Sequence, residues 1–212
     1  MQKETEEDFA KVYRPASAPL IRRTLLVPGT WLEDEVVLQL FHFMAWRRRY
    51  TRRHVALIDP LVLCAMAKGD VAHHARALTA QFTDGTPLLL LPLVCGSHWS
   101  LLMCRTATNT WYHADSLQPY HARLAHDTLQ RLRFIEGVVL DPYASVTAVA
   151  VPRQRGGWEC GLYTLQYMLA AIEASRKAKT TEHRFAVLLT KYCRLACDAN
   201  LPLFTQRLLE EV

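Results

Sequence analysis

Hydrophobic residues recur at helical spacing in the N-terminal part of the chain. The residues that carry this spacing are Val36, Val37, Leu40, Phe41 and Met44. Their intervals of three or four positions predict a helix that ends at about Arg49. Thr30 and Glu33 have the spacing of a capping box, in which Thr30 is the N-cap residue and Glu33 is the third residue of the helix. The helix is therefore expected to begin just after Thr30.

Short apolar runs alternate with turn residues in the middle of the chain. The predicted strands are residues 88–94, 99–105, 111–116 and 145–151. Turn residues at 95–97 and 106–110 separate the first three, so these three strands are expected to be neighbours in one sheet.

Helical patterns occupy both sides of this strand-rich region. Further helices are predicted at residues 60–68, 70–82, 120–135, 183–197 and 201–211, and from Cys160 onward. No repeat or linker divides the pattern, so residues 21–212 are expected to form one α+β domain with helices around a central sheet. Residues 1–20, which are polar and then rich in proline, are expected to form a flexible N-terminal arm.

Composition places the chain among ordinary globular proteins, because 50% of its 212 residues are hydrophobic and 21% are charged. The longest apolar run, residues 87–95, is much shorter than the roughly 20 residues that span a bilayer. The first residues lack the apolar segment of a secretory leader. The six cysteines include no CxxC pair, which favours free thiols in a reducing compartment. We therefore expect a cytoplasmic or nuclear protein without a membrane partner.

The net charge of +5 depends largely on one basic run, RRRYTRRH, which starts at Arg47 and has Arg53 as its last arginine. Such a run can bind nucleic acid, an acidic protein surface or a nuclear import receptor. It can also be the solvated end of a helix, where cations suit the helix dipole. We favour the solvated helix end, and nucleic acid is not an expected partner.

Several motifs are absent: the P-loop, GxGxxG, GxSxG and HExxH. Their absence argues against nucleotide hydrolysis, dinucleotide redox chemistry, serine esterase chemistry and zinc proteolysis. Cys193 and Cys197 share a predicted helix, and His73 and His74 are adjacent. Neither pair has the spacing of a four-ligand zinc site, and both cysteines are expected to pack as small apolar residues.

Cys160 is placed for nucleophilic chemistry, because it opens a predicted helix whose N-terminus favours a thiolate. Gly161 follows it, where a substrate could approach the backbone closely. His98 begins a predicted strand after a turn, and Asp115 ends the next strand. Adjacent strand ends can place Asp115 beside His98, so that one ring nitrogen meets the carboxylate and the other meets Cys160.

Four segments resemble signatures of the Ulp/SENP family of cysteine proteases, which remove ubiquitin-like modifiers. These segments are HWSLL from His98, HADSL from His113, Gln154 followed at the sixth position by Cys160-Gly161, and WLEDEVV from Trp31. The resemblance implies the α+β fold of that family, with a central mixed sheet flanked by helices. The chain is similar to the compact members of the family, which include the deneddylase branch.

The resemblance also implies roles. Cys160 would be the nucleophile, His98 the general base and acid, and Asp115 the carboxylate that orients it. Gln154 would donate to the oxyanion. Trp31 and Trp99 would enclose the Gly-Gly tail of the modifier, a slot that suits residues without Cβ.

Asp34 would contact a basic residue of the modifier's tail. The chain departs from the family at Glu33, at Glu159 and at the pair His113-Ala114, where an aromatic pair is usual. None of these changes removes a residue of the triad, so they bear on substrate preference.

The predicted activity is that of a thiol isopeptidase, which cleaves after the C-terminal Gly-Gly of the neddylation modifier or SUMO. It would release the modifier from lysines or mature its precursor, as a monomer and without metal or organic cofactor. Two alternatives remain at this point: an acetyltransferase with the same triad, and a silent modifier-binding module. Acetyltransferases of that kind do not need the slot formed by the two tryptophans.

Overall fold

The computed structural model describes residues 25, 29–47, 55–67, 79, 86–135, 140–178, 181–199 and 204–206. The N-terminal arm predicted at 1–20, most of the predicted helices 70–82 and 201–211, and the histidine pair at 73–74 lie outside these residues. So do the basic run beyond Arg47 and the side chain of Cys197.

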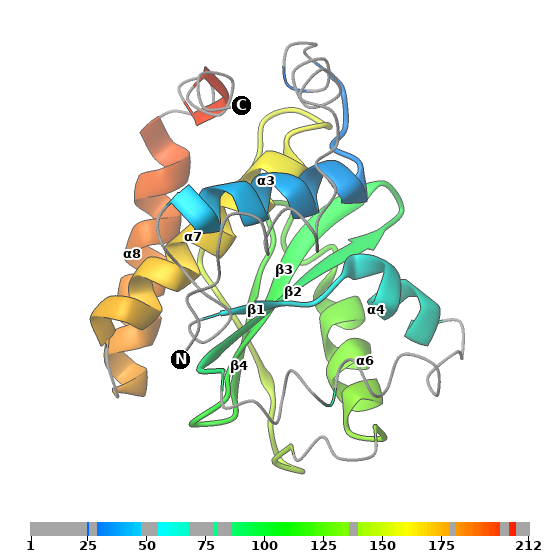
Figure 1. Ribbon diagram of the computed structural model, residues 1–212, viewed down its shortest axis with the longest axis vertical. Helices are drawn as coiled ribbons and strands as arrows, with labels where there is room; N and C mark the ends of the chain where they lie inside the picture. The colour runs from blue at the N-terminus through cyan, green and yellow to red at the C-terminus, as the bar shows by residue number, and fades with distance from the viewer. Residues whose placement is uncertain are drawn as a thin grey trace.

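A five-stranded mixed sheet forms the centre of the molecule (Figure 1), with the strands in the order β1-β2-β3-β4-β5. The strands are β1 (Ala56–Leu57), β2 (Leu88–Cys95), β3 (His98–Arg105), β4 (Thr110–Ala114) and β5 (Val146–Ala148). β2, β3 and β4 pair antiparallel, whereas β1 and β5 add parallel strands at the two edges. The expected neighbours in the sheet and the expected α+β class are confirmed.

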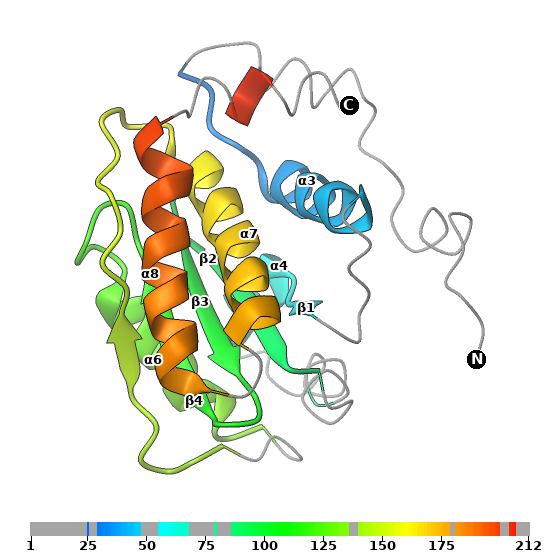
Figure 2. The ribbon, with the colours of Figure 1, turned by 90° about the vertical axis from the view of Figure 1, so that its left-hand side faces the viewer.

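Helices cover both faces of this sheet. α3 (Asp34–Arg47), α7 (Cys160–Ala178) and α8 (Glu182–Ala199) lie on one face, and α4 (Pro60–Ala67) and α6 (Ala122–Leu132) lie on the other (Figure 2). Side chains alternate between the faces along each strand. In β3, Trp99 and Leu101 face α7, whereas Leu102 and Cys104 face α6.

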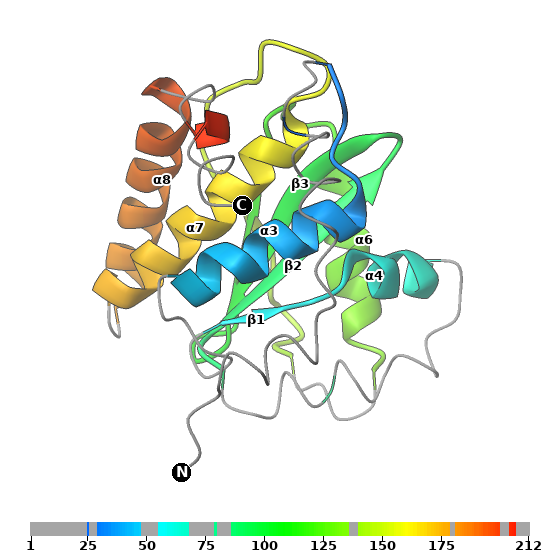
Figure 3. The same cartoon turned by 45° about the horizontal axis from the view of Figure 1, so that its top comes forward.

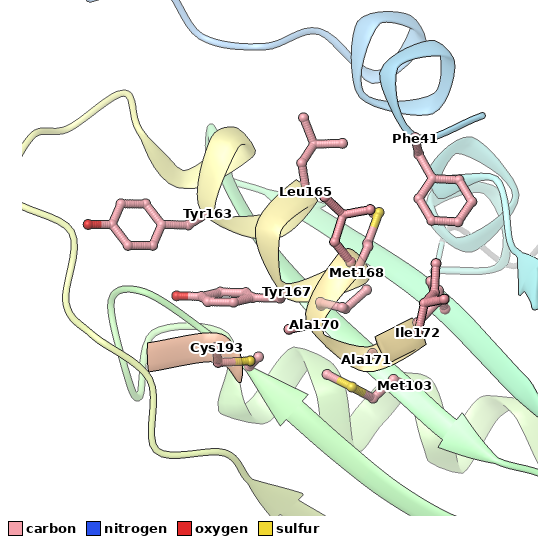
Figure 4. Packing of buried hydrophobic residues seen from close by; sticks show 14 of the residues in the cluster. Phe41, Met103, Tyr163, Leu165, Tyr167, Met168, Ala170, Ala171, Ile172 and Cys193 are labelled. Atoms are coloured by element: carbon pink, nitrogen blue, oxygen red, sulfur yellow. The ribbon is translucent and has the colours of Figure 1, made fainter. Parts of the chain in front are cut away.

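α7 is the central helix of the larger core, and α3 lies across it (Figure 3). Residues 160–172 are all buried, because the sheet, α3 and α8 surround them. Side chains of α3, β3, α7 and α8 converge there (Figure 4). Cys193 is one of these buried side chains, as its predicted apolar role requires. A helix surrounded in this way holds its first residue, Cys160, in a fixed place.

Two details of the sequence prediction were wrong. α3 begins at Asp34, after the predicted cap, and the carbonyl of Glu33 accepts the N–H of Val37 at 3.0 Å. β1 was not predicted, because a strand of two residues carries no alternating pattern. Among the described residues, no helix is both long and apolar enough to cross a membrane.

Candidate active site

A buried histidine and a buried aspartate meet at one end of the sheet. His98 is the first residue of β3, and Asp115 directly follows β4. Nε2 of His98 lies 2.7 Å from Oδ1 of Asp115. The turn that precedes His98 reverses the chain through Gly96 and Ser97, both with positive φ. The tight turn and the sheet register therefore bring the two side chains together, as the sequence predicts.

Backbone amides hold Asp115 in place. Its Oδ1 accepts the N–H of Leu117 at 2.8 Å, and its Oδ2 accepts the N–H of His121 at 2.9 Å. Burial by itself would raise the pKa of Asp115, but these bonds and the bond to His98 outweigh it and lower the pKa to about 2. The carboxylate is therefore ionised and fixed.

Cys160 completes the triad from α7. It is the first residue of that helix, and its thiol shares a hydrogen bond with the ring of His98. Burial would lower the pKa of His98, but hydrogen bonds to Asp115 and Cys160, together with the charges of those two groups, raise it to about 9. His98 is therefore protonated at neutral pH. Cys160 therefore lies beside a protonated ring and at the N-terminus of a helix.

Gln154 lies close to this triad in sequence, and its carboxamide is held at both ends. Oε1 accepts the hydroxyl of Ser116 at 2.5 Å, and Nε2 donates to the carbonyl of Gly156 at 2.7 Å. The N–H of Gln154 also donates to the carbonyl of Ser116 at 3.1 Å. Because a carboxamide nitrogen carries two hydrogens, the second remains for another acceptor.

Glu159 shapes the loop between Gln154 and the nucleophile. Its Oε2 accepts the N–H groups of Arg155 and Gly156, at 3.0 and 2.8 Å. In the sequence, Glu159 stands out only as a departure from the family pattern. The contact gives it a defined role, since it fixes the backbone that leads to Cys160.

The two tryptophans have different environments. Trp31 is 46% exposed, whereas Trp99 is 4% exposed and belongs to the core beneath α3 and α7. The indole N–H of Trp99 donates to the carbonyl of Leu32 at 2.9 Å. This bond ties the segment that carries Trp31 to β3. Asp34 begins α3 a few residues further on and is partly exposed.

Gly161 serves close packing in this structure, not the approach of a substrate as the sequence suggested. A Cβ at Gly161 would lie 2.9 Å from Cβ of Leu32. The side chain of Leu32 therefore fills the space that the glycine leaves open. The missing Cβ lets the segment that carries Trp31 pack against the start of α7.

Behind the triad lies a buried chain of hydrogen bonds that the sequence did not reveal. His113 Nε2 and Ser100 Oγ lie 3.1 Å apart, and Ser100 Oγ and His121 Nδ1 lie 2.9 Å apart. Nε2 of His121 donates to the carbonyl of Cys95 at 3.0 Å. Burial lowers the pKa of both histidines, that of His113 to about 4. Neutral His121 must then accept the hydroxyl proton of Ser100, and Ser100 must accept from His113.

The sequence gives only one sign of these hydrogen bonds, which is that their residues lie on the same face of the sheet. Ser100 follows His98 at the next position on the same face of β3, and His113 faces the same side from β4. Such positions become visible only once the strands are paired.

The arrangement is that of an acyl-transfer site. It holds a thiol nucleophile at a helix N-terminus, a histidine that already carries a proton, and a carboxylate that orients the histidine. The N–H groups at the start of α7 and the remaining hydrogen of Gln154 can stabilise an oxyanion.

Comparisons with known proteins agree with this chemistry. The sequence model of the Ulp1 protease family, C-terminal catalytic domain, matches residues 30–191. Sentrin-specific protease 8 of Rattus norvegicus is 24% identical over 155 residues, which cover 67% of this chain and 69% of the rat protein.

Two solved structures share the fold. One is SUMO protease Ulp1 with its catalytic cysteine oxidized to a sulfonic acid, with a TM-score of 0.62 and 14% identity over 100% of this chain and 96% of that chain. The other is the Xanthomonas campestris effector protein XopD bound to ubiquitin, with a TM-score of 0.59 and 21% identity over 77% of this chain and 89% of that chain.

Proposed function

The chain belongs to the Ulp1 protease family of cysteine peptidases, and from this premise we propose that it is a thiol isopeptidase for a ubiquitin-like modifier. It cleaves after the C-terminal Gly-Gly of the modifier and frees the lysine to which the modifier was attached. The observation that carries the proposal is the position of His98, whose Nε2 lies 2.7 Å from Oδ1 of Asp115 and whose ring also interacts with the thiol of Cys160.

The first half of the reaction forms a thioester. The thiolate of Cys160 attacks the carbonyl carbon of the terminal glycine, and the resulting oxyanion accepts from Gln154 and from the first turn of α7. The C–N bond then breaks as His98 gives its proton to the leaving lysine nitrogen. The modifier remains attached to Cys160 through its carbonyl carbon.

The second half releases the modifier. The neutral ring of His98 takes a proton from water, which attacks the thioester carbonyl. The C–S bond breaks and the modifier leaves as a C-terminal carboxylic acid, which gives its proton to solvent; the thiolate and the protonated histidine are restored. Asp115 stays ionised throughout and stabilises the protonated ring.

The Gly-Gly requirement rests on the segment that carries Trp31. Its exposed indole is available to an extended chain, and its neighbour Leu32 is fixed both by Trp99 and by contact with Gly161. A narrow passage beside an aromatic ring admits residues without Cβ and excludes larger ones.

SUMO and the neddylation modifier are the substrates that we propose. Support for SUMO comes from the shared fold with SUMO protease Ulp1. Support for the neddylation modifier comes from the resemblance to the compact members of the family. The XopD structure holds ubiquitin, so ubiquitin belongs in the same test.

The test uses SUMO, the neddylation modifier and ubiquitin, each with an electrophile at its C-terminus, and reads the intact mass of the protein. We expect wild type to gain the mass of one SUMO or one neddylation modifier and Cys160→Ala to gain none. Cys95→Ala is the matched control, because Cys95 is an exposed thiol at the turn before His98 and its loss should leave the adduct intact. Folded wild type that gains no modifier would contradict the proposal and favour the acetyltransferase or the silent binder.

A further inference from the structure

An exposed aromatic ring lies against the buried histidine of the triad. Tyr120 is 59% exposed, and its ring meets that of His98 edge to face, with the centroids 5.2 Å apart. It also contacts the ring of His121, at 5.1 Å between centroids. The mechanism described above gives Tyr120 no role.

The turn before His98 leaves room for the hydroxyl of Tyr120. A Cβ at Gly96 would lie 2.9 Å from Oη of Tyr120, and the φ of Gly96 is +58°. The backbone of Tyr120 itself is fixed as well, because its N–H donates to the carbonyl of Leu117 at 3.1 Å. The exposed ring is therefore held in one place beside His98.

Successive side chains of β3 point to opposite faces of the sheet, and this separates the ring of Tyr120 from the segment that carries Trp31. Trp99 points to the face of α3 and α7, where it bonds to Leu32. Tyr120 and His121 lie at the approach to α6, on the opposite face of the sheet. The ring of His98 contacts both regions, since it interacts with Cys160 of α7 and packs against Tyr120. If the modifier's tail lies along the segment of Trp31, Tyr120 lies on the far side of His98.

We propose that Tyr120 binds the leaving group: the lysine side chain of the target protein and the residues beside it, or the first residues of a precursor tail. The assignment rests on the proposed function. His98 must reach the leaving nitrogen to protonate it as the C–N bond breaks and the thioester forms, so the leaving group lies on the side of His98 away from the tail. The methylene groups of a lysine pack well on an exposed aromatic face.

The experiment compares two substrates of the same modifier. One is an isopeptide conjugate to a lysine-containing peptide, and the other is the C-terminal methyl ester, whose leaving group is too small to reach Tyr120. For Tyr120→Ala we expect kcat/KM to fall about tenfold on the conjugate, the size expected for loss of one aromatic contact. On the methyl ester it should stay within about twofold of wild type.

Two variants serve as controls. Tyr120→Phe keeps the ring and should match wild type on both substrates. Tyr143→Ala removes another exposed tyrosine, 90% exposed and just before β5, and should also match wild type.

An equal loss on both substrates would overturn the assignment, because Tyr120 would then act only by positioning His98. Unchanged cleavage of the conjugate would overturn it as well. The adduct with the electrophilic modifier tests the proposed function separately: a wild type that forms the adduct while Tyr120→Ala cleaves the conjugate normally rejects the role of Tyr120 alone.

Discussion

The hydroxyl of Ser116 donates to Oε1 of Gln154 at 2.5 Å, and this bond fixes the orientation of a carboxamide six residues before Cys160 in the sequence. With Oε1 occupied, the nitrogen end points away from Ser116 and donates one hydrogen to Gly156. Ser116 directly follows Asp115 in the sequence. The same short segment after β4 therefore orients both His98 and Gln154, the donor that we propose for the oxyanion.

The first prediction concerns this pair. Gln154→Ala removes a donor to the oxyanion and is expected to lower kcat by about 10²–10³-fold. Ser116→Ala leaves the donor present but less well oriented, so the expected loss of kcat is smaller, about tenfold. Steady-state kinetics on one modifier substrate measures both. A loss in Ser116→Ala as large as that in Gln154→Ala would mean that Ser116 itself contacts the reacting atoms.

The second prediction concerns stability and pH. The pKa of His98 is raised from 6.5 to about 9 in the folded protein. The contribution of protonated His98 to the unfolding free energy is therefore complete below about pH 6.5 and is lost as the pH rises through about 9. Asp115→Asn removes the charge that supports this shift. The difference in unfolding free energy between wild type and Asp115→Asn should therefore shrink as the pH rises from 6.5 to 9.

Urea denaturation at several pH values measures this difference. The charge of Asp115 does not change across that window, because its own pKa is lowered from 3.8 to about 2 and its contribution is lost only as the pH falls through about 2. A difference that is constant or grows between pH 6.5 and 9 would show that His98 does not carry the extra proton.

The candidate triad could be predicted from the sequence because each member occupies a position with a local signature. Cys160 opens a helix, and His98 and Asp115 stand at the ends of neighbouring strands. The roles of Ser116 and Glu159 were missed, because they consist of hydrogen bonds to a loop whose path no periodic pattern specifies.

The same limit applies to the core. β3 is buried on both faces, so its sequence does not show which side chains face α7 and which face α6. The burial of Trp99 and the chain through Ser100 follow from that choice of face. The sequence prediction also misplaced the start of α3. Thr30 and Glu33 have the spacing of a capping box, but the helix begins after both residues.

The third prediction concerns the buried chain behind the triad. Ser100→Ala removes the hydroxyl between His113 and His121 and leaves two buried ring nitrogens without that partner. The unfolding free energy is expected to fall by about 1–3 kcal/mol. Ser145→Ala, at an exposed serine, should change it by less than about 0.5 kcal/mol. Equal stability of the two variants would mean that the chain of hydrogen bonds contributes nothing.

The last prediction separates the two tryptophans, which the sequence treats alike. Trp99→Ala removes a buried core side chain and its bond to Leu32, so the unfolding free energy should fall by about 3–5 kcal/mol. Trp31→Ala removes a ring that is 46% exposed and should lower stability much less than Trp99→Ala, while KM for a modifier substrate rises because the tail loses its aromatic contact. Trp31→Phe keeps an aromatic face and should restore part of the binding. Denaturation and steady-state kinetics on the same three variants test both roles at once. If Trp31→Ala destabilises the fold as much as Trp99→Ala and leaves KM unchanged, Trp31 is a structural residue and the modifier's tail binds elsewhere.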